Sequence, residues 1–210
     1  MSASVHATAL IEDGVVLGDG TSVWDNVHIR HSTTVGRNCV IGEKTHIAYG
    51  VRIGDLVKIN AMVYICTAVT IENGVMISAG TIFTNDRFPR ATTPDLREAR
   101  TSAPDEHTLP TLVREGATIG AGSIIGCDLT IGRFAMVGMG SVVTRSVPDF
   151  HLVVGNPAHS VGVVCRCGAI VHRFGDAIDA APALDAACPT CGSAYIIEGG
   201  YVSEREPVLT

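Results

Sequence analysis

An aliphatic residue recurs at every sixth position over most of the sequence. Thirteen consecutive steps from Val5 to Ile77 carry Val, Ile or Leu, and six more run from Val113 to Val143. If about a third of positions were aliphatic by chance, thirteen in a row would have a probability on the order of one in a million. A period of six fits neither the 3.6-residue period of a helix nor the alternation of an isolated strand. It predicts short β segments separated by tight turns, with the aliphatic side chains pointing inward.

A second track in the sequence supports this register. Four positions after each aliphatic residue comes a small or β-branched residue, as at Val15 and Thr21. The position directly after the aliphatic residue is often glycine, as at Gly18 and Gly36. We interpret this glycine as relief of the turn. Three segments would close one triangular coil, and stacked coils form a parallel β-helix. Nineteen hexads make about six coils, spaced roughly 4.8 Å apart. The alternative is a β-sandwich, whose strands do not keep a strict period of six.

The composition agrees with a core built from many small, similar layers. Of the 210 residues, 46% are hydrophobic, only 5% are aromatic and 23 are glycine, which excludes a disordered chain. The formal charge of −6 offers no general attraction to nucleic acid, so we expect no nucleic-acid partner. No apolar run approaches the roughly 18 residues of a membrane span, and no charged-then-apolar leader opens the sequence. We therefore expect a cytoplasmic protein without a membrane span.

The six-residue register is interrupted by an inserted loop, which we place at residues 84–112. Long loops in compact domains are usually functional, so we predict that this one carries part of a site. The alternative is a solvated insertion with no role. The loop contains four prolines and four arginines, Arg87, Arg90, Arg97 and Arg100.

Four cysteines near the C-terminus form two closely spaced pairs. Each pair is followed by glycine, and the pairs stand at Cys165 and Cys167 and at Cys188 and Cys191. They predict the two knuckles of a zinc ribbon, with His172 as a substitute ligand. Four thiolates leave no open position for water, so the zinc would be structural. Two disulfides or chance clustering are the alternatives.

The cysteine pairs divide the chain into two expected domains. We predict a β-helix over residues 1–163 and a zinc-ribbon-like module over residues 164–210. The remaining cysteines lie within the repeats and are predicted to be core or wall residues rather than nucleophiles: Cys39, Cys66 and Cys127.

Four motifs, together with the repeats, resemble those of a known protein family. They are FTNDRFPRA at Phe83–Ala91, LPTLV at Leu109–Val113, VVT at Val142–Thr144 and VGNPA at Val154–Ala158. Together with the hexads they resemble the hexapeptide-repeat acyltransferases. Within that group they look like sugar-nucleotide N-acetyltransferases that act on UDP-2-acetamido-3-amino-2,3-dideoxyglucuronate or related dTDP-amino sugars. The resemblance implies a left-handed all-β helix, an acetyl-CoA co-substrate, and a homotrimer with active sites between subunits.

The same resemblance implies roles for residues of the loop motif. The reaction would be direct attack of a sugar amine on the thioester, so the enzyme mainly orients the reactants. Asn85 is the predicted catalytic residue, with its amide oxygen holding the amine, and Asp86 is predicted to bind substrate and is a candidate proton acceptor. Arg87 and Arg90 suit the diphosphate or a sugar carboxylate, unless they are solvated loop charges. His28 is a further substrate-binding candidate.

Residues of the later motifs are the predicted coenzyme A contacts. Arg145 follows the VVT motif and would meet a CoA phosphate. Gly155, Asn156 and Pro157 would line the pantetheine slot between subunits.

Three other functions are compatible with the repeats. A γ-type carbonic anhydrase needs a His-x4-His pair, which the sequence lacks. A sugar or small-molecule O-acetyltransferase would use a histidine base, for which His107 in the loop is the candidate. A non-enzymatic scaffold whose ribbon binds a partner is the third, and the specific loop motif argues against it.

Overall fold

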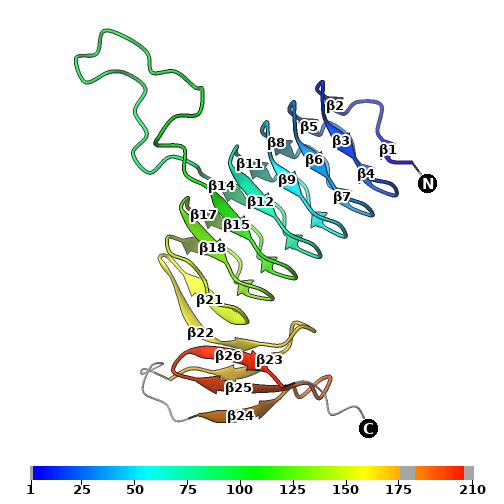
Figure 1. The fold of residues 1–210 in the computed structure, drawn as a ribbon, viewed down its shortest axis with the longest axis vertical. Helices are drawn as coiled ribbons and strands as arrows, with labels where there is room; N and C mark the ends of the chain where they lie inside the picture. The colour runs from blue at the N-terminus through cyan, green and yellow to red at the C-terminus, as the bar shows by residue number, and fades with distance from the viewer. Residues whose placement is uncertain (1, 176–182, 206–210) are drawn as a thin grey trace.

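The computed structural model describes residues 2–175 and 183–205, and within these the chain is all-β. Three parallel sheets form the sides of a prism, and the chain visits them in turn, so that each strand from β1 to β17 pairs with the strand three further along the chain (Figure 1). Paired residues are 18 positions apart, as Ser4 and Ser22 are, which is three hexads. The predicted parallel β-helix is confirmed, and the sandwich alternative is excluded.

The first two sheets contain the following strands. Sheet A consists of β1 (Ser4–Val5), β4 (Ser22–Val23), β7 (Val40–Ile41), β10 (Lys58–Ile59), β13 (Met76–Ile77), β16 (Thr118–Ile119), β19 (Met136–Val137), β21 (His151–Gly155), β22 (Ala158–Val164) and β23 (Ile170–Arg173). Sheet B consists of β2 (Leu10–Ile11), β5 (His28–Ile29), β8 (His46–Ile47), β11 (Tyr64–Ile65), β14 (Ile82–Phe83), β17 (Ile124–Ile125) and β20 (Val142–Val143).

Two further sheets complete the described chain. Sheet C, the third side of the prism, consists of β3 (Val16–Leu17), β6 (Thr34–Val35), β9 (Arg52–Ile53), β12 (Val69–Ile71), β15 (Thr111–Val113) and β18 (Leu129–Ile131). A small antiparallel sheet in the C-terminal region consists of β24 (Leu184–Ala187), β25 (Ala194–Glu198) and β26 (Tyr201–Glu204).

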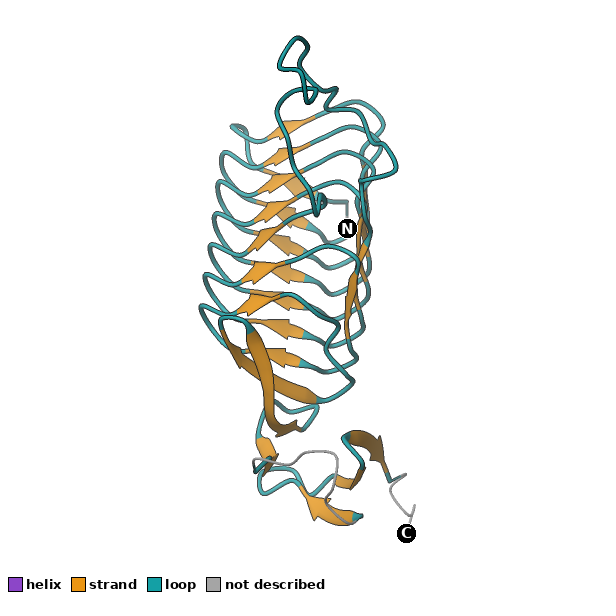
Figure 2. Cartoon of the chain, turned by 90° about the vertical axis from the view of Figure 1, so that its left-hand side faces the viewer, coloured by secondary structure: helices purple, strands orange, loops and turns teal. Residues whose placement is uncertain are grey.

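The stack is taller than the six coils predicted from the hexad count, because β1 to β21 place eight parallel strands in sheet A (Figure 2). The count missed the last coil because its register shortens. Met136 pairs with Leu152, only 16 positions later, so the six-residue step no longer finds the inward Val153. The hexad count also omitted Phe83, because it included only aliphatic residues, although Phe83 occupies an inward position and is buried.

Both aliphatic tracks point into the prism. The inward isoleucines from Ile29 to Ile131 are almost fully buried, and so are the small residues of the second track, such as Thr21 and Val27. Buried threonines satisfy their hydroxyls by donating to carbonyl oxygens of the next coil, as Thr33 does to Ala48 at 2.9 Å. Within the described residues, no buried polar side-chain atom is left without a hydrogen-bond partner.

The expected role of the repeated glycines is wrong in its mechanism. The left-handed backbone conformation falls three residues before each inward aliphatic, and residues other than glycine adopt it at many coils: Asn26, Ser32, Asn38, Lys44, Leu56, Met62, Ala68, Asp128 and Phe134. The glycine directly after the aliphatic has no positive φ. A Cβ there would collide with the next coil, as it would at Gly120, where the N of Met139 lies at 2.5 Å. These glycines permit close stacking of coils.

The C-terminal region packs on the last coil through a second core. β21 and β22 form an antiparallel hairpin that extends sheet A, and β23 pairs with β22. Across the junction, the ring of Phe150 stacks on Phe134 and meets the ring of Tyr195 in an edge contact. His151 faces the carbonyl oxygen of Gly200 with Nε2 at 2.7 Å and the hydroxyl of Ser160 with Nδ1 at 2.8 Å. Since a carbonyl only accepts, Nε2 carries the proton.

The predicted boundaries differ slightly from the observed elements. β15 begins at Thr111, so Thr111 and Leu112 belong to sheet C, and the inserted loop spans residues 84–110. The strand β22 runs across the predicted domain boundary at residue 163. Residues 176–182 and 206–210 of the predicted module lie outside the described residues. Within the described ranges, no helix is long and apolar enough to cross a membrane.

Candidate functional site

The inserted loop leaves the prism at the corner after β14 and returns to start β15. Its two ends are held together, because Asp86 and Thr108 form an antiparallel bridge and the N–H of Leu109 donates to the backbone oxygen of Asn85 at 2.8 Å. Paired residues on either side of the loop are 42 positions apart in the sequence instead of 18, as Ile82 and Ile124 are. The coils below and above the loop therefore remain in register.

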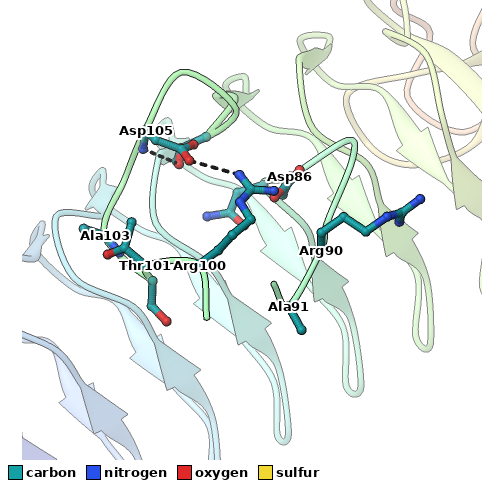
Figure 3. Close-up of a pocket in the computed structure, with 10 residues that line it drawn as sticks. Asp86, Arg90, Ala91, Arg100, Thr101, Ala103 and Asp105 are labelled. Atoms are coloured by element: carbon teal, nitrogen blue, oxygen red, sulfur yellow. Dashed lines mark hydrogen bonds and ion pairs between the residues drawn. The ribbon is translucent and has the colours of Figure 1, made fainter. Parts of the chain in front are cut away.

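A cavity of about 340 Å³ lies between the two arms of the loop (Figure 3). We call it the loop cavity. Ligand pockets begin at about 300 Å³, so it can hold a small polar group or a sugar. Both arms and the corner line it, with residues Asn85, Asp86, Arg90, Ala91, Arg100, Thr101, Ser102, Ala103, Asp105 and Thr108.

Asn85 lies in the wall of the loop cavity at the prism corner. It stands three residues after the outward residue of β14, so the parallel register puts it in one column with Thr67 before it and Cys127 after it. Its side chain is half-buried and has no hydrogen-bond partner among the described residues. An unpaired amide facing a polar cavity can accept from a ligand amine.

The acidic residues of the loop cavity are already engaged by the loop itself. Asp86 Oδ1 accepts from the N–H of Phe88 at 2.7 Å. Asp105 accepts from the N–H of His107 at 2.9 Å and pairs with Arg100 at 3.1 Å. The backbone donor of His107 and the Arg100 guanidinium hold the pKa of Asp105 below its usual range, so this residue is a carboxylate at neutral pH.

The two arginines predicted to bind substrate are placed differently. Arg90 lines the loop cavity, and its Nη1 donates to the carbonyl oxygen of Pro89 at 2.9 Å. Arg87 is exposed and forms an ion pair at 2.8 Å with Asp128 on the next coil, outside the residues that line the loop cavity. His107, the candidate base for O-transfer, is also exposed and outside that lining.

His28 belongs to a separate cluster, three strands before β14 in sheet B. Its Nε2 lies 2.8 Å from Glu12, whose carboxylate also accepts from Arg30 and from the N–H of His31. These donors lower the pKa of Glu12 to about 2, with the backbone N–H of His31 contributing most. The His28 ring lies edge-on to the ring of His46. Burial lowers the pKa of His46. His28 does not line the loop cavity; the cluster reaches the cavity only through His31, which stacks on Tyr49, whose hydroxyl donates to the carbonyl oxygen of the lining residue Ser102 at 3.5 Å.

The predicted coenzyme A residues lie on later coils. Arg145 follows β20 by the same interval as Asn85 follows β14, so it occupies the same corner two strands further along sheet B. It is exposed. The exposed residues Gly155, Asn156 and Pro157 lie at a different corner, at and just after the end of β21, where the N–H of Gly155 donates to Ser141 Oγ at 3.2 Å.

The four C-terminal cysteines converge on one point. All their Sγ atoms lie within 4.8 Å of one another, and all four are free thiols: Cys165, Cys167, Cys188 and Cys191. The closest pairs join the two knuckles, with Cys165 to Cys191 at 3.4 Å. Ser193 lowers the pKa of the Cys191 thiol to about 6 by hydrogen bonding, and backbone donors lower the pKa of Cys188. His172 is outside the cluster and packs against Phe174.

The cysteines of the repeats are placed as expected for core and wall residues. Cys39 and Cys66 are buried, and burial raises the pKa of the Cys66 thiol to about 12, which keeps it protonated. Cys127 is half-buried at the corner beside Asn85.

Sequence reasoning missed two of the four charged residues that line the loop cavity. Arg100 was one of four loop arginines with nothing to distinguish it, and Asp105 carried no signal. They are five residues apart on the returning arm, and their pairing depends on the irregular path of that arm, which has no periodicity to predict it.

The chain resembles known transferases of the hexapeptide class. Residues 14–49 match the family model described as bacterial transferase hexapeptide (six repeats), and residues 32–67 and 110–145 match the hexapeptide repeat of succinyl-transferase. Over 94 residues the chain is 43% identical to a dTDP-3-amino-3,6-dideoxy-alpha-D-galactopyranose 3-N-acetyltransferase of Aneurinibacillus thermoaerophilus, a match covering 45% of this chain and 44% of that relative. The matched part thus spans less than half of the relative.

Two further comparisons concern the repeats and the fold. The chain is 46% identical over 50 residues to the serine acetyltransferase of Escherichia coli, covering 24% of this chain and 18% of that enzyme. It also superposes on a mutant of AntD, an N-acyltransferase from Bacillus cereus, in complex with dTDP and coenzyme A. That match has a TM-score of 0.53 and 21% identity and covers 78% of this chain and 82% of AntD. This likeness shows a common fold. The chain is therefore a hexapeptide-repeat β-solenoid protein that resembles amino-sugar N-acetyltransferases.

Proposed function

We propose that this protein is an acyl-CoA-dependent N-acetyltransferase that acetylates the amino group of a nucleotide-linked sugar. The observation that carries the proposal is the loop cavity, which has the unpaired Asn85 amide in its wall. The amino-sugar N-acetyltransferase at 43% identity supports the substrate class, and AntD binds dTDP and coenzyme A on the same fold.

The main task of the protein in this reaction is to orient the amine toward the thioester. A neutral amine attacks the thioester carbon, the new C–N bond forms as the C–S bond breaks, and CoA leaves as a stable thiolate. Asn85 would accept a hydrogen bond from the amine and aim its lone pair, because an amide cannot act as a base at neutral pH. The proton released by the amine would pass to Asp86, whose Oδ1 already accepts from Phe88, or to water.

The other predicted substrate and coenzyme contacts complete the proposal. Arg90 borders the loop cavity and is a candidate for the diphosphate, while Arg87 would first have to leave Asp128. Arg145 stands at Asn85's corner two strands further on, which suits a CoA phosphate approaching from the C-terminal coils. The segment 155–157 would contact pantetheine. Acetyl-CoA and nucleotide sugars are cytoplasmic metabolites, so the proposed reaction belongs in the cytoplasm.

The outward face of sheet B supports a homotrimer with sites between subunits. Every outward residue on this face is apolar, aromatic or histidine, namely Leu10, His28, His46, Tyr64, Ile82, Ile124 and Val142. Sheets A and C instead present charged residues such as Lys58 and Arg52. The charged groups that border this face, Glu12 and Arg30, are paired with each other at 3.3 Å, and a largely uncharged face is suited to burial against other copies. In such an assembly His28 of one copy would meet a site on another.

The cysteine cluster is proposed to hold a structural zinc ion. Zinc–sulfur bonds of about 2.3 Å in a tetrahedron place sulfurs roughly 3.8 Å apart, and the observed Sγ atoms, with their closest pairs at 3.4 and 3.5 Å and all within 4.8 Å, fit this geometry. The four ligands would be Cys165, Cys167, Cys188 and Cys191. The cluster lies in the second core beside Tyr195, so the ion would tie the turn between β24 and β25 to the turn after β22.

The role of Asn85 is tested by substitution. We expect Asn85→Ala to lower acetyl transfer to a nucleotide-linked amino sugar by orders of magnitude, because the amine loses its positioning contact, while CoA binding stays intact. Asn60→Ala, at an exposed turn after β10 on sheet A, is the matched control. Wild-type turnover in Asn85→Ala would refute the role. Loss of activity in His107→Ala, with a hydroxyl sugar as the better acceptor, would favour O-transfer instead.

The metal is tested by elemental analysis of the purified full chain. We expect about one zinc per chain, and we expect Cys188→Ser to lose it and to lower Tm, because this thiol is buried in the second core. Cys39→Ser in the β-helix core is the control for losing a buried thiol, and it should retain the zinc. A stable protein that contains no metal would reject the zinc site.

A further inference from the structure

The four arginines of the inserted loop differ in how firmly they are held. Arg97 is 83% exposed at the loop tip, and Arg87 is 52% exposed and pairs with Asp128 on the prism. Arg90 is exposed and directed away from Asp105 (Figure 3). The Arg100 side chain is only 26% exposed and lines the loop cavity. Arg100 is thus the loop arginine whose side chain is most enclosed by the cavity.

Arg100 is positioned from both of its ends. Its backbone N–H donates to the carbonyl oxygen of Ala91 at 3.0 Å, beside the bridge between Thr92 and Ala99 that joins the loop arms. Its Nη2 donates to Asp105 Oδ2 at 3.1 Å. Asp105 is itself held, because its Oδ1 accepts from the N–H of His107 and its own N–H donates to Thr108. The guanidinium is therefore oriented before any ligand arrives.

This arrangement leaves donors available to a ligand. A guanidinium has five N–H donors, and within the described residues the Nε and Nη1 groups of Arg100 have no acceptor. Asp105 offsets the charge of Arg100, so recognition would depend on the geometry of these donors more than on net charge. A planar fork matches two oxygens of a carboxylate or a phosphoryl group.

We propose that Arg100, oriented by Asp105, is the oxyanion-binding residue of the loop cavity. Its ligand is the anionic part of the acceptor, either a phosphoryl group of the nucleotide diphosphate or a carboxylate on the sugar. Because Asn85 lines the same cavity, one acceptor molecule bound to Arg100 would have its amine within reach of the catalytic corner. The identity of the ligand rests on the proposed function, whereas the subsite does not.

The test measures binding without turnover. The full chain is titrated calorimetrically with inorganic pyrophosphate, with dTDP and with glucuronate. We expect Arg100→Gln to weaken binding of the recognised anion by about tenfold to a hundredfold, since hydrogen bonds to charged groups are the strong ones, and Arg100→Lys to have an intermediate effect. Arg97→Gln makes the same charge change on the same loop outside the loop cavity, and it should bind like wild type.

The pattern of losses identifies the source of the anion. Loss of pyrophosphate and dTDP binding assigns Arg100 to the diphosphate, and loss of glucuronate binding assigns it to a sugar carboxylate. Asp105→Asn separates recognition from the charge of the ion pair, because the asparagine amide oxygen can still accept from Nη2 and keep the guanidinium oriented, so we expect binding within about fivefold of wild type. Equal losses in Asp105→Asn and Arg100→Gln would overturn the proposal, and so would a wild-type protein that binds none of the probes.

The same experiments separate this inference from the proposed function. Binding that depends on Arg100, without acetyl transfer to any amino sugar, would leave the subsite standing and reject the transferase. Acetyl transfer with unchanged anion binding in Arg100→Gln would do the reverse.

Discussion

Replacing Gly120 and Gly122 by alanine, one at a time, distinguishes the two ways in which glycine serves this fold. The two residues belong to the same coil. Gly120 follows the inward Ile119 and has no positive φ, but a Cβ there would lie 2.5 Å from the N of Met139 and 2.7 Å from the carbonyl oxygen of Val137. Gly122 has a φ of +68°, and a Cβ added there would have no neighbouring atom within 4 Å. One position tests close approach and the other tests backbone conformation.

The magnitudes follow from these geometries. Gly122→Ala forces a left-handed alanine, at roughly 1–2 kcal/mol, offset by about 0.4–1 kcal/mol of lost freedom in the unfolded chain, so the net cost is about 1 kcal/mol. Gly120→Ala must displace the backbone of the next coil, which cannot rotate aside as a side chain does. Overpacking costs about 1–3 kcal/mol, and contacts to backbone atoms of three residues put this case near 3 kcal/mol.

Hydrogen exchange read by mass spectrometry over residues 118–143 is the suitable assay, because stacked repeats open in local units. The N–H of Gly120 donates to Val137 at 2.8 Å across the coils and reports their separation. We expect exchange there to accelerate about a hundredfold in Gly120→Ala and about fivefold in Gly122→Ala. An equal or larger effect of Gly122→Ala would show that backbone conformation, and not the distance between coils, decides where glycine is required.

Two further predictions concern the C-terminal junction and the sheet B face. Burial lowers the pKa of His151 below its ordinary value of 6.5, so the unfolded chain takes up this proton first. The contribution of His151 to stability is therefore complete above about pH 6.5 and falls as the pH drops toward the pKa of the folded state. The difference in Tm between about pH 7.5 and about pH 5.5 should be smaller in His151→Gln than in the wild type. An unchanged difference would contradict this. Tyr64 is 44% exposed on the outward face of sheet B, so Tyr64→Glu should reduce the mass measured by light scattering from that of three chains to that of one. Thr34→Glu on sheet C is the control and should leave the mass unchanged. A trimeric Tyr64→Glu variant would exclude the sheet B face as the interface.

Local periodicity was enough to predict the prism. Each hexad needs one inward aliphatic and one small inward residue, and the same requirement recurs at every coil, so residues such as Ile65 and Val63 could be assigned to the core without any long-range information. The cysteine cluster was predictable for a similar reason, because two short knuckles bring their ligands together once the strands between them pair. The family motif singled out Asn85, which the structure puts in the wall of a cavity.

The failures of prediction share a physical cause, which is that they depend on contacts between coils or on the irregular path of the loop. The coil count fell short because the final coil loses two residues before β21, a change seen in the pairing of Ile131 with Val147 and of Met136 with Leu152. The glycine mechanism was wrong because the separation of stacked backbones is not a property of one hexad.

The amino-acid sequence by itself determined a solenoid of six-residue steps, an inserted loop and a cysteine cluster, because each is specified by residues close together in the chain. Only the tertiary structure decided which loop side chains share a cavity. Arg87 pairs with Asp128 on the neighbouring coil, whereas Arg100 turns inward because Asp105, five residues further along the same returning arm, accepts its hydrogen bond. Four arginines that are equivalent as sequence letters become different once the loop closes, since long charged side chains are positioned by their partners in space.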